Sequence, residues 1–309
     1  MREFLLRLSE NKRLAPFIIH NGVSRRVARR FVAGETLDDA IVAAEQVNRA
    51  LQLASLDLLG ENVSDEAGAR SAAAGYRAIF DRIAQERLDA NVSLKLTQLG
   101  LDLGEDLCRE LLEGIVEHAA SLGNFVRIDM EGSAYTQRTV EITKRVRAEY
   151  SAVGTVMQAY LYRTEQDVRD LLAAGCRMRL CKGAYKEPPE VAFAKKSDVD
   201  ANYVKLMKLL LPSGIYHGIA THDPVMIQAT KDFAREKNIA NDKFEFQMLY
   251  GIRTDLQKQL VREGYRLRVY IPFGTDWFPY FMRRLAERPA NVAFFLRNLL
   301  PRASNGANL

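Results

Sequence analysis

Short runs of β-forming residues alternate with segments of helical length through most of this chain, and this alternation is the strongest constraint on its fold. Eight such runs occur, and amphipathic segments such as 104–120 and 165–174 follow them. The runs are 53–59, 91–96, 125–130, 154–160, 176–182, 217–222, 244–250 and 267–273. A strand–helix unit repeated in this way is typical of a parallel sheet that closes on itself. The sequence therefore predicts an α/β fold, a (β/α)8 TIM-like barrel.

An open, doubly wound sheet is the alternative, because the same alternation of strands and helices produces it. That fold usually carries a GxGxxG turn after an early strand, and no such turn is present here. A nucleotide cofactor would therefore have to be held in another way. The 309 residues and the 48% hydrophobic content are sufficient for one barrel with a substantial core.

Three regions are expected along the chain. Residues 1–50 are predicted to form an N-terminal helical arm, in which charged residues such as Asp38 and Glu45 alternate with apolar ones. Residues 51–300 would form the barrel, and a long helical stretch ends it. Residues 301–309 are mostly small and polar and would form a flexible tail.

The net charge is only mildly basic, because 44 basic residues face 39 acidic ones, for a formal charge of +5. The densest positive cluster, within 25–30, has i, i+4 spacing and would occupy one side of a helix. A solvated helix face is one interpretation, and a patch for lipid or nucleic acid is the other. We expect no nucleic-acid partner and regard this helix as a candidate membrane-facing element.

The sequence carries no evident targeting signal or membrane span. Residues 1–14 mix charges with apolar side chains, and no apolar run approaches the length that crosses a bilayer. The cysteines, Cys108, Cys176 and Cys181, form no CxxC pair and lack zinc-like histidine spacing. We expect a cytoplasmic protein without a bound metal, at most peripheral at the inner face of the membrane.

Polar residues gather where the predicted strands end. In a barrel, side chains at the C-terminal ends of the strands point into the mouth where reactions occur. Charges at the tips of apolar strands need a partner or a task. The residues in question are Lys95, Arg127, Asp129, Gln158, Arg179, Lys182, Thr221, His222, Asp223 and Tyr270. We therefore expect the functional site at this end of the barrel.

Individual residues of this set have more than one interpretation. Lys95 and Asp129 would form an ion pair at the barrel mouth or contact a substrate directly, and the two roles are compatible. His222 is a satisfied loop histidine or a ligand. The segment 179–185 places two cations, a glycine and a tyrosine at a strand-to-helix junction, which suits an anionic cofactor but also an ordinary turn.

The last helical stretch, 278–300, carries two adjacent arginines and a nearby glutamate. Arg284 and Glu287 are three residues apart, so they share a helix face and can pair. Arg283 would then lie beside them as a second carboxylate-binding fork. A solvated, charged helix is the alternative interpretation.

These residues lie within longer stretches that resemble the catalytic barrel of proline dehydrogenases, including the short bacterial monofunctional members. The stretches are NVSLKLTQLG at 91–100, VRIDMEGS at 126–133, VMQAYLYRT at 156–164, RLCKGAYKE at 179–187, ATHD at 220–223, FQMLYG at 246–251 and VYIPFGTDWFPYFMRRLAERPAN at 269–291. They follow one another in the order expected of the family. The resemblance implies FAD bound without a Rossmann fold over the strand ends, and a final helix that caps the active site.

The resemblance also implies roles for particular residues. The substrate pocket would comprise Lys95, Asp129, Tyr185, Tyr270, Arg283, Arg284 and Glu287, with the two arginines on the carboxylate of L-proline. The flavin or its phosphates would contact Met130, Gln158, Arg179, Lys182, Gly183, Ala184, Thr221 and His222. Hydride would pass from proline C5 to flavin N5, with Lys95, Asp129 and Arg179 as catalytic residues.

The product, 1-pyrroline-5-carboxylate, would leave for a separate dehydrogenase, because the chain is too short for a fused second enzyme. Electrons would pass to a quinone. The acceptor of the amine proton stays open, since an Asp129 paired with Lys95 would be a poor base. A Schiff-base aldolase using Lys95 or Lys182 is the rival enzyme class, and a non-catalytic basic scaffold acting through 25–30 is a third hypothesis.

Overall fold

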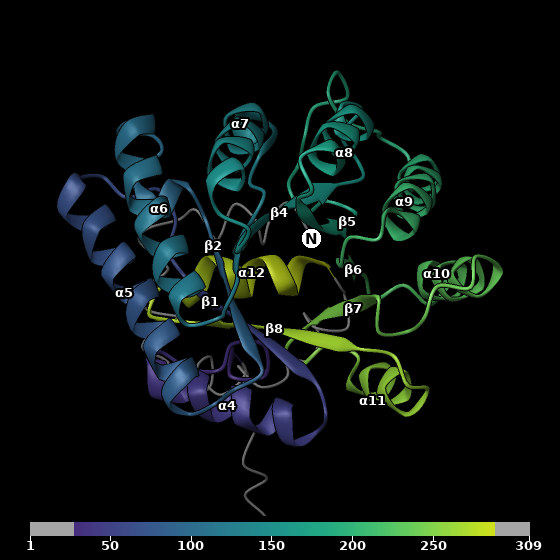
Figure 1. Cartoon of the computed structure of the whole chain (residues 1–309), viewed down its shortest axis with the longest axis horizontal. Helices are drawn as coiled ribbons and strands as arrows, with labels where there is room; N and C mark the ends of the chain where they lie inside the picture. Colours follow the sequence, from purple (N-terminus) through teal and green to yellow (C-terminus); the bar gives the residue numbers. More distant parts are fainter. Residues whose placement is uncertain (1–27, 288–309) are drawn as a thin grey trace, which may run out of the picture.

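The predicted barrel is confirmed. The computed structural model describes residues 28–287, and side chains up to residue 284. Eight parallel strands pair in chain order, and β8 pairs with β1 to close the sheet (Figure 1). Ser55 on β1 lies opposite both Asn91 on β2 and Tyr270 on β8. Closure leaves no exposed sheet edge, so every strand is hydrogen-bonded on both sides.

All eight predicted strands are present. They are β1 (Leu53–Leu58), β2 (Ala90–Leu94), β3 (Val126–Ile128), β4 (Val153–Gln158), β5 (Arg177–Cys181), β6 (His217–Ala220), β7 (Phe244–Leu249) and β8 (Leu267–Phe273). Several end a residue or two earlier than the sequence suggested. The residues left over, such as Lys95 and Asp129, therefore stand just past the strand ends, where their side chains are available to the barrel mouth.

Helices follow the strands and surround the barrel. They are α4 (Leu37–Arg49), α5 (Glu66–Gln85), α6 (Glu105–Ser121), α7 (Ser133–Glu149), α8 (Thr164–Ala173), α9 (Lys196–Leu210), α10 (Pro224–Glu236), α11 (Thr254–Arg262) and α12 (Trp277–Glu287), with short 3-10 turns at Thr97–Leu99 and Leu211–Ser213. Local sequence sets several starts. Thr36 and Asp39 form a capping box before α4, and Asp223 caps α10, whose first residue is Pro224.

The apolar core lies between the strands and the surrounding helices. Leu56, Val92 and Leu94 are fully buried and pack with residues of α5 and α6 in one cluster. Leu180 and Phe246 belong to a second cluster with residues of α8, α9 and α10. The outward faces of the strands thus provide the hydrophobic surface that holds the helices in place.

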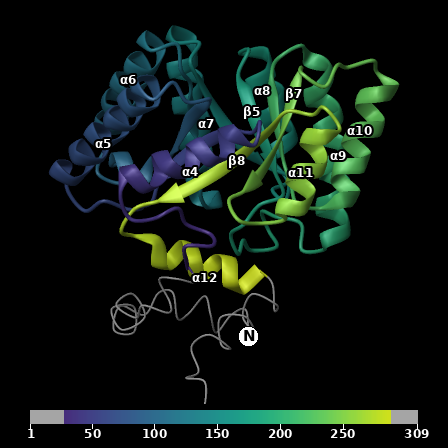
Figure 2. The ribbon, with the colours of Figure 1, turned by 90° about the horizontal axis from the view of Figure 1, so that it is seen from below.

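Two helices occupy unexpected or special positions. Helix α4, which precedes the first strand, packs against β1 and β8, and its Ala40 and Ile41 share a core cluster with Val269. Helix α12, which follows β8, lies across one end of the barrel (Figures 1 and 2). The final helix therefore caps the barrel, as predicted, and α4 covers the side of β8. Residues 1–27 of the predicted arm, residues 288–300 of the predicted helical stretch and the tail 301–309 lie outside the described residues.

Between residues 28 and 287, no helix is both long enough and apolar enough to cross a bilayer.

Candidate active site

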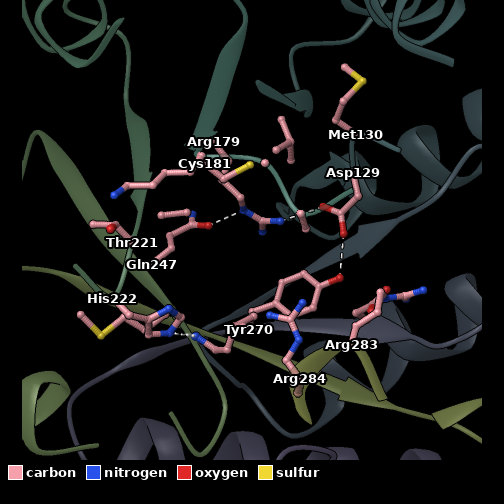
Figure 3. Close-up of a pocket in the computed structure, with 18 of the residues that line it drawn as sticks. Asp129, Met130, Arg179, Cys181, Thr221, His222, Gln247, Tyr270, Arg283 and Arg284 are labelled. Carbon is pink, nitrogen blue, oxygen red and sulfur yellow. Dashed lines mark hydrogen bonds and ion pairs between the residues drawn. The ribbon is translucent and has the colours of Figure 1, made fainter. Parts of the chain in front are cut away.

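A cavity of about 620 Å³ opens between the C-terminal strand ends and α12 (Figure 3). Every one of the eight strands, or the loop after it, contributes a lining residue, and α12 closes the cavity with Tyr280, Arg283 and Arg284. Most of the predicted site residues line it: Lys95, Asp129, Met130, Arg179, Lys182, Gly183, Ala184, Tyr185, Thr221, His222, Tyr270, Arg283 and Arg284. The barrel thus brings together residues that lie up to about 190 positions apart in sequence.

Asp129 lines the cavity and is held there by two donors. Arg179 Nη1 donates to Asp129 Oδ1 at 2.7 Å, and the Tyr270 hydroxyl donates to Oδ2 at 2.7 Å. The Arg179 guanidinium also lies 5.1 Å from the centre of the Tyr270 ring. Burial, followed by the charge of Asp129, raises the pKa of Tyr270 well above its usual value, so the phenol stays protonated and remains a donor.

The prediction that Lys95 pairs with Asp129 is wrong, because Lys95 pairs with Asp57 instead. Lys95 Nζ lies 3.0 Å from Asp57 Oδ1, and both side chains are buried. Strand β1 runs directly beside β2, so Asp57 reaches Lys95 from the neighbouring strand, whereas Asp129 is occupied by Arg179 and Tyr270. Asp57 lines the cavity and had no role in the sequence-based hypothesis.

The protonation of the Lys95–Asp57 pair follows from burial and mutual attraction. Burial alone would lower the pKa of Lys95, but Asp57 and Asp129 outweigh it and raise that pKa above its usual value. Burial raises the pKa of Asp57, and the Lys95 charge opposes this shift without cancelling it. Lys95 is therefore a protonated, fixed cation in the wall of the cavity.

The sequence contained signals for two residues that were missed. In β1, Ser55 and Asp57 alternate with Ala54 and Leu56, which is the two-residue period of a strand with one polar face. Gln247 lies within the FQMLYG stretch but had no assigned role, and it lines the cavity with Arg179 Nε donating to its Oε1. Polar alternation inside a predicted strand therefore carried information that strand ends alone did not.

Both arginines of α12, Arg283 and Arg284, line the cavity (Figure 3). Arg283 Nη2 donates to Glu61 Oε1 at 3.0 Å, a contact that the sequence did not predict. The Arg284 guanidinium carbon lies 5.2 Å from the centre of the Tyr280 ring. The side chain of Glu287 is outside the described residues, so its predicted pairing with Arg284 stays a prediction.

The opposite side of the cavity is formed by the turn after β5 and by the end of β6. Lys182 Nζ lies 2.7 Å from Asp223 Oδ2 and 2.5 Å from Asp200 Oδ1. Gly183 has a φ of +119°, and an added Cβ would fall 2.4 Å from the ring of Tyr160, so only glycine suits this turn. His222 Nε2 accepts a hydrogen bond from the backbone N–H of Leu249 at 2.9 Å, which supports the interpretation as a satisfied loop histidine.

The lining chemistry matches a flavin. Met130, Val156 and Met248 provide apolar walls for a flat ring system, and Arg179 provides a buried cation beside them. Gln158 is not among the lining residues; its Nε2 donates to the Glu131 carbonyl at 2.7 Å. Its Oε1, however, is buried without a hydrogen-bond partner among the described residues. A bound group that donates a hydrogen bond would satisfy this acceptor.

A family model described as proline dehydrogenase matches residues 40–297. The chain belongs to the proline dehydrogenase family. It is 45% identical over 300 residues to proline dehydrogenase 1 of Bacillus subtilis (strain 168), a match that covers 97% of this chain and 99% of that protein. Proline dehydrogenase of Deinococcus radiodurans is 42% identical over 279 residues, covering 89% of this chain and 90% of that protein.

Solved structures of the family carry the same fold. The crystal structure of proline utilization A from Bdellovibrio bacteriovorus inactivated by N-propargylglycine matches with a TM-score of 0.81 and 27% identity. The match covers 85% of this chain and 33% of that one, so the present chain spans about a third of the larger protein. The match therefore supports the (β/α)8 fold of this chain.

Proposed function

We propose that this protein is an FAD-dependent proline dehydrogenase that oxidises L-proline to 1-pyrroline-5-carboxylate, the first step of proline catabolism to glutamate. The observation that carries the proposal is one cavity that is lined both by Arg283 and Arg284 and by the Asp129–Arg179–Tyr270 cluster, in a chain of this family. Such a cavity offers an anion-binding side and a polar, buried side, as a small amino acid requires.

The arginines of α12 would bind the proline carboxylate. A guanidinium donates two parallel hydrogen bonds to a carboxylate, and two guanidiniums fix both its position and its orientation. Arg283 is already held by Glu61, and Glu287 would orient the pair. The apolar ring would pack on Tyr185 and Tyr270, and Lys95 and Asp129 would complete the pocket.

The remaining lining residues, together with Gln158, would hold FAD. Met130, Gln158, Arg179, Thr221 and His222 would contact the ring system, whose N5 atom supplies the acceptor for the C5 hydride. The turn formed by Lys182, Gly183 and Ala184 would receive phosphate oxygens. Lys182 is paired with Asp200 and Asp223, and these pairs would fix its ammonium group for that contact.

The amine proton must leave before or during hydride transfer, because the product is an imine. Asp129 already accepts hydrogen bonds on both oxygens from Arg179 and Tyr270, so it is poorly placed to take a proton. We assign Asp129 an anchoring role. Lys95 cannot act as a base either, because its raised pKa keeps it protonated. Its charge would instead stabilise the carboxylates of Asp57 and Asp129.

A Schiff-base aldolase is the rival activity. That chemistry needs a neutral amine, and the raised pKa of Lys95 opposes it. Purified protein should be yellow and should bleach when L-proline is added without oxygen. A colourless protein that is covalently trapped by borohydride with a carbonyl substrate would overturn the proposal.

Arg284→Lys tests the carboxylate clamp, since lysine keeps the charge but loses the planar fork. The KM for proline should rise about tenfold while flavin content stays the same. Arg235→Lys on the exposed side of α10 is the matched control and should change neither quantity. Unchanged proline binding in Arg284→Lys would show that the clamp is misassigned.

The reduced flavin would pass its electrons to a quinone, and a separate dehydrogenase would consume the product. A cytoplasmic enzyme that binds the inner face of the membrane peripherally would meet both needs. The cluster within 25–30 lies partly outside the described residues, so its membrane role stays a prediction. Sedimentation with anionic vesicles, compared with neutral ones, tests that role, and salt should weaken the binding.

A further inference from the structure

Arg179 is fixed by a partner on each of its three guanidinium nitrogens. Nη1 donates to Asp129 at 2.7 Å, Nη2 donates to Ser93 Oγ at 2.9 Å, and Nε donates to Gln247 Oε1. Asp129 directly follows β3, Ser93 lies on the neighbouring strand β2, and Gln247 lies on β7, on the other side of β5 in the strand order. The guanidinium therefore lies in the wall of the cavity and is held from three directions (Figure 3).

Only one orientation of the Gln247 amide satisfies both of its neighbours. Its Nε2 donates to Glu245 Oε1 at 2.5 Å, and its Oε1 accepts from Arg179. Arginine can only donate, and an ionised carboxylate can only accept. Turning the amide over would oppose oxygen to oxygen at one end and donor to donor at the other. Glu245 thereby determines which end of the amide faces Arg179.

The Glu245 carboxylate is itself ionised and immobile. It is 2% exposed and accepts from Arg268 Nε at 2.7 Å and from the Tyr216 hydroxyl at 2.9 Å. Burial would raise the pKa of Glu245, but Arg268 and the hydrogen bonds from Arg268, Gln247 and Tyr216 outweigh burial and lower it. The acceptor-only state that orients the amide is therefore the stable one at neutral pH.

Gly218 on β6 makes room for this arrangement. It lies opposite Arg179 on one side and opposite Glu245 on the other. A Cβ at this position would fall 2.4 Å from Gln247 Nε2, closer than atoms can approach. The missing side chain lets the Gln247 amide lie across β6 and reach Arg179.

We propose that Glu245 and Gln247 are positioning residues that orient Arg179 for the reaction, with Gly218 providing the space. The inference rests on the proposed function, since it assumes that Arg179 faces a bound flavin. A guanidinium in a fixed position stabilises the additional negative charge of a reduced flavin without reorganisation. A looser guanidinium would do so less well, so the flavin would be harder to reduce.

Glu245→Gln in the flavin-loaded enzyme is the first test. The neutral amide no longer dictates the orientation of Gln247, so Arg179 loses a fixed acceptor. The flavin reduction potential, measured without proline, should fall, and kcat should fall about tenfold, with KM for proline changing less than about twofold. Tyr216→Phe is the matched control. It removes a hydrogen bond from the same carboxylate but leaves the amide oriented, so it should preserve both the potential and kcat.

Gly218→Ala is the second test, because it adds one methyl group and alters no polar group. The displaced Gln247 should produce the same lowered potential, and this variant decides the question if Glu245→Gln does not fold. A potential unchanged in Gly218→Ala, or an equal shift in Tyr216→Phe, would overturn the proposal. An unmodified protein that binds no flavin would instead refute the proposed function, which distinguishes the two failures.

Discussion

The two faces of the barrel sheet have opposite chemistry. On β5, Arg179 points inward and bonds to residues of β2 and β7 and to Asp129 just past β3, whereas the next residue, Leu180, points outward into an apolar cluster under the helices. Barrel interiors are usually filled with branched apolar side chains. Here the inner face carries hydrogen-bonded charges, and the apolar core is moved to the outer face.

This difference separates the source of stability from the source of function. The outer face buries hydrocarbon, whose contribution scales with area and does not depend on orientation. The inner face buries polar groups, which are tolerated only when each finds its partner. Substitutions on the two faces should therefore fail in different ways.

Lys95→Met should have the largest effect on stability. It removes the partner of Asp57, which is 1% exposed, and leaves a buried carboxylate without its cation. Breaking such a pair typically costs about 3–5 kcal/mol, measurable by urea denaturation. The double variant Lys95→Met with Asp57→Asn removes both charges and should recover most of that loss. Equal stability of single and double variants would show that the pair is not coupled.

Leu180→Ala tests the outer face at the residue beside Arg179. Leu180 is fully buried, so the truncation should lower the free energy of unfolding by about 3 kcal/mol. The folded fraction should keep its kcat and flavin potential, because no inner-face contact changes. A kcat loss comparable to that of Glu245→Gln would mean that the two faces are not separable.

His217, the first residue of β6, is a buried titratable side chain, and it makes the free energy of unfolding depend on pH. Burial, and then the charge of Arg127, lowers its pKa to about 3, and its Nδ1 accepts a hydrogen bond from the backbone N–H of Met178 at 3.0 Å. The unfolded chain binds a proton near pH 6.5, whereas the folded chain does not. Stability is therefore fully present above pH 6.5 and is lost as the pH falls towards 3.

The expected slope for this one group approaches about 1.4 kcal/mol per pH unit below pH 6. His217→Asn keeps an acceptor for Met178 but cannot titrate, so its stability should change less between pH 7 and pH 5. Parallel urea titrations of the two proteins at both pH values measure the difference. Identical pH dependence would assign the acid sensitivity to other groups.

The fold was predictable because its signals are local. The strands and helices appear as runs of neighbouring residues, so the eightfold alternation and the final helical stretch could be predicted from the residues; its position over the active site came from the family resemblance. The partner of Lys95 could not, because Asp57 on β1 and Asp129 just past β3 both flank β2, and only the three-dimensional positions of Arg179 and Tyr270 decide between them. The same holds for Glu61 and Arg283, which are joined by the closure of the barrel.

Breaking the exposed ion pair between Glu45 and Arg49 on α4 should have the smallest effect on the free energy of unfolding. This exposed pair is the reference for the buried pair of Lys95 and Asp57. Arg49 Nη2 lies 2.8 Å from Glu45 Oε2, yet the Arg49 side chain is 75% exposed. Water screens the attraction, so Glu45→Gln should cost only about 0.3–0.5 kcal/mol. At 1 M NaCl the Debye length falls to about 3 Å, and this cost should vanish. The cost of Lys95→Met should persist at that salt concentration, because dissolved ions do not reach the buried Asp57. If salt reduced this cost, water would have to enter the barrel interior. The inner face would then not be the sealed, fixed environment that Arg179 requires.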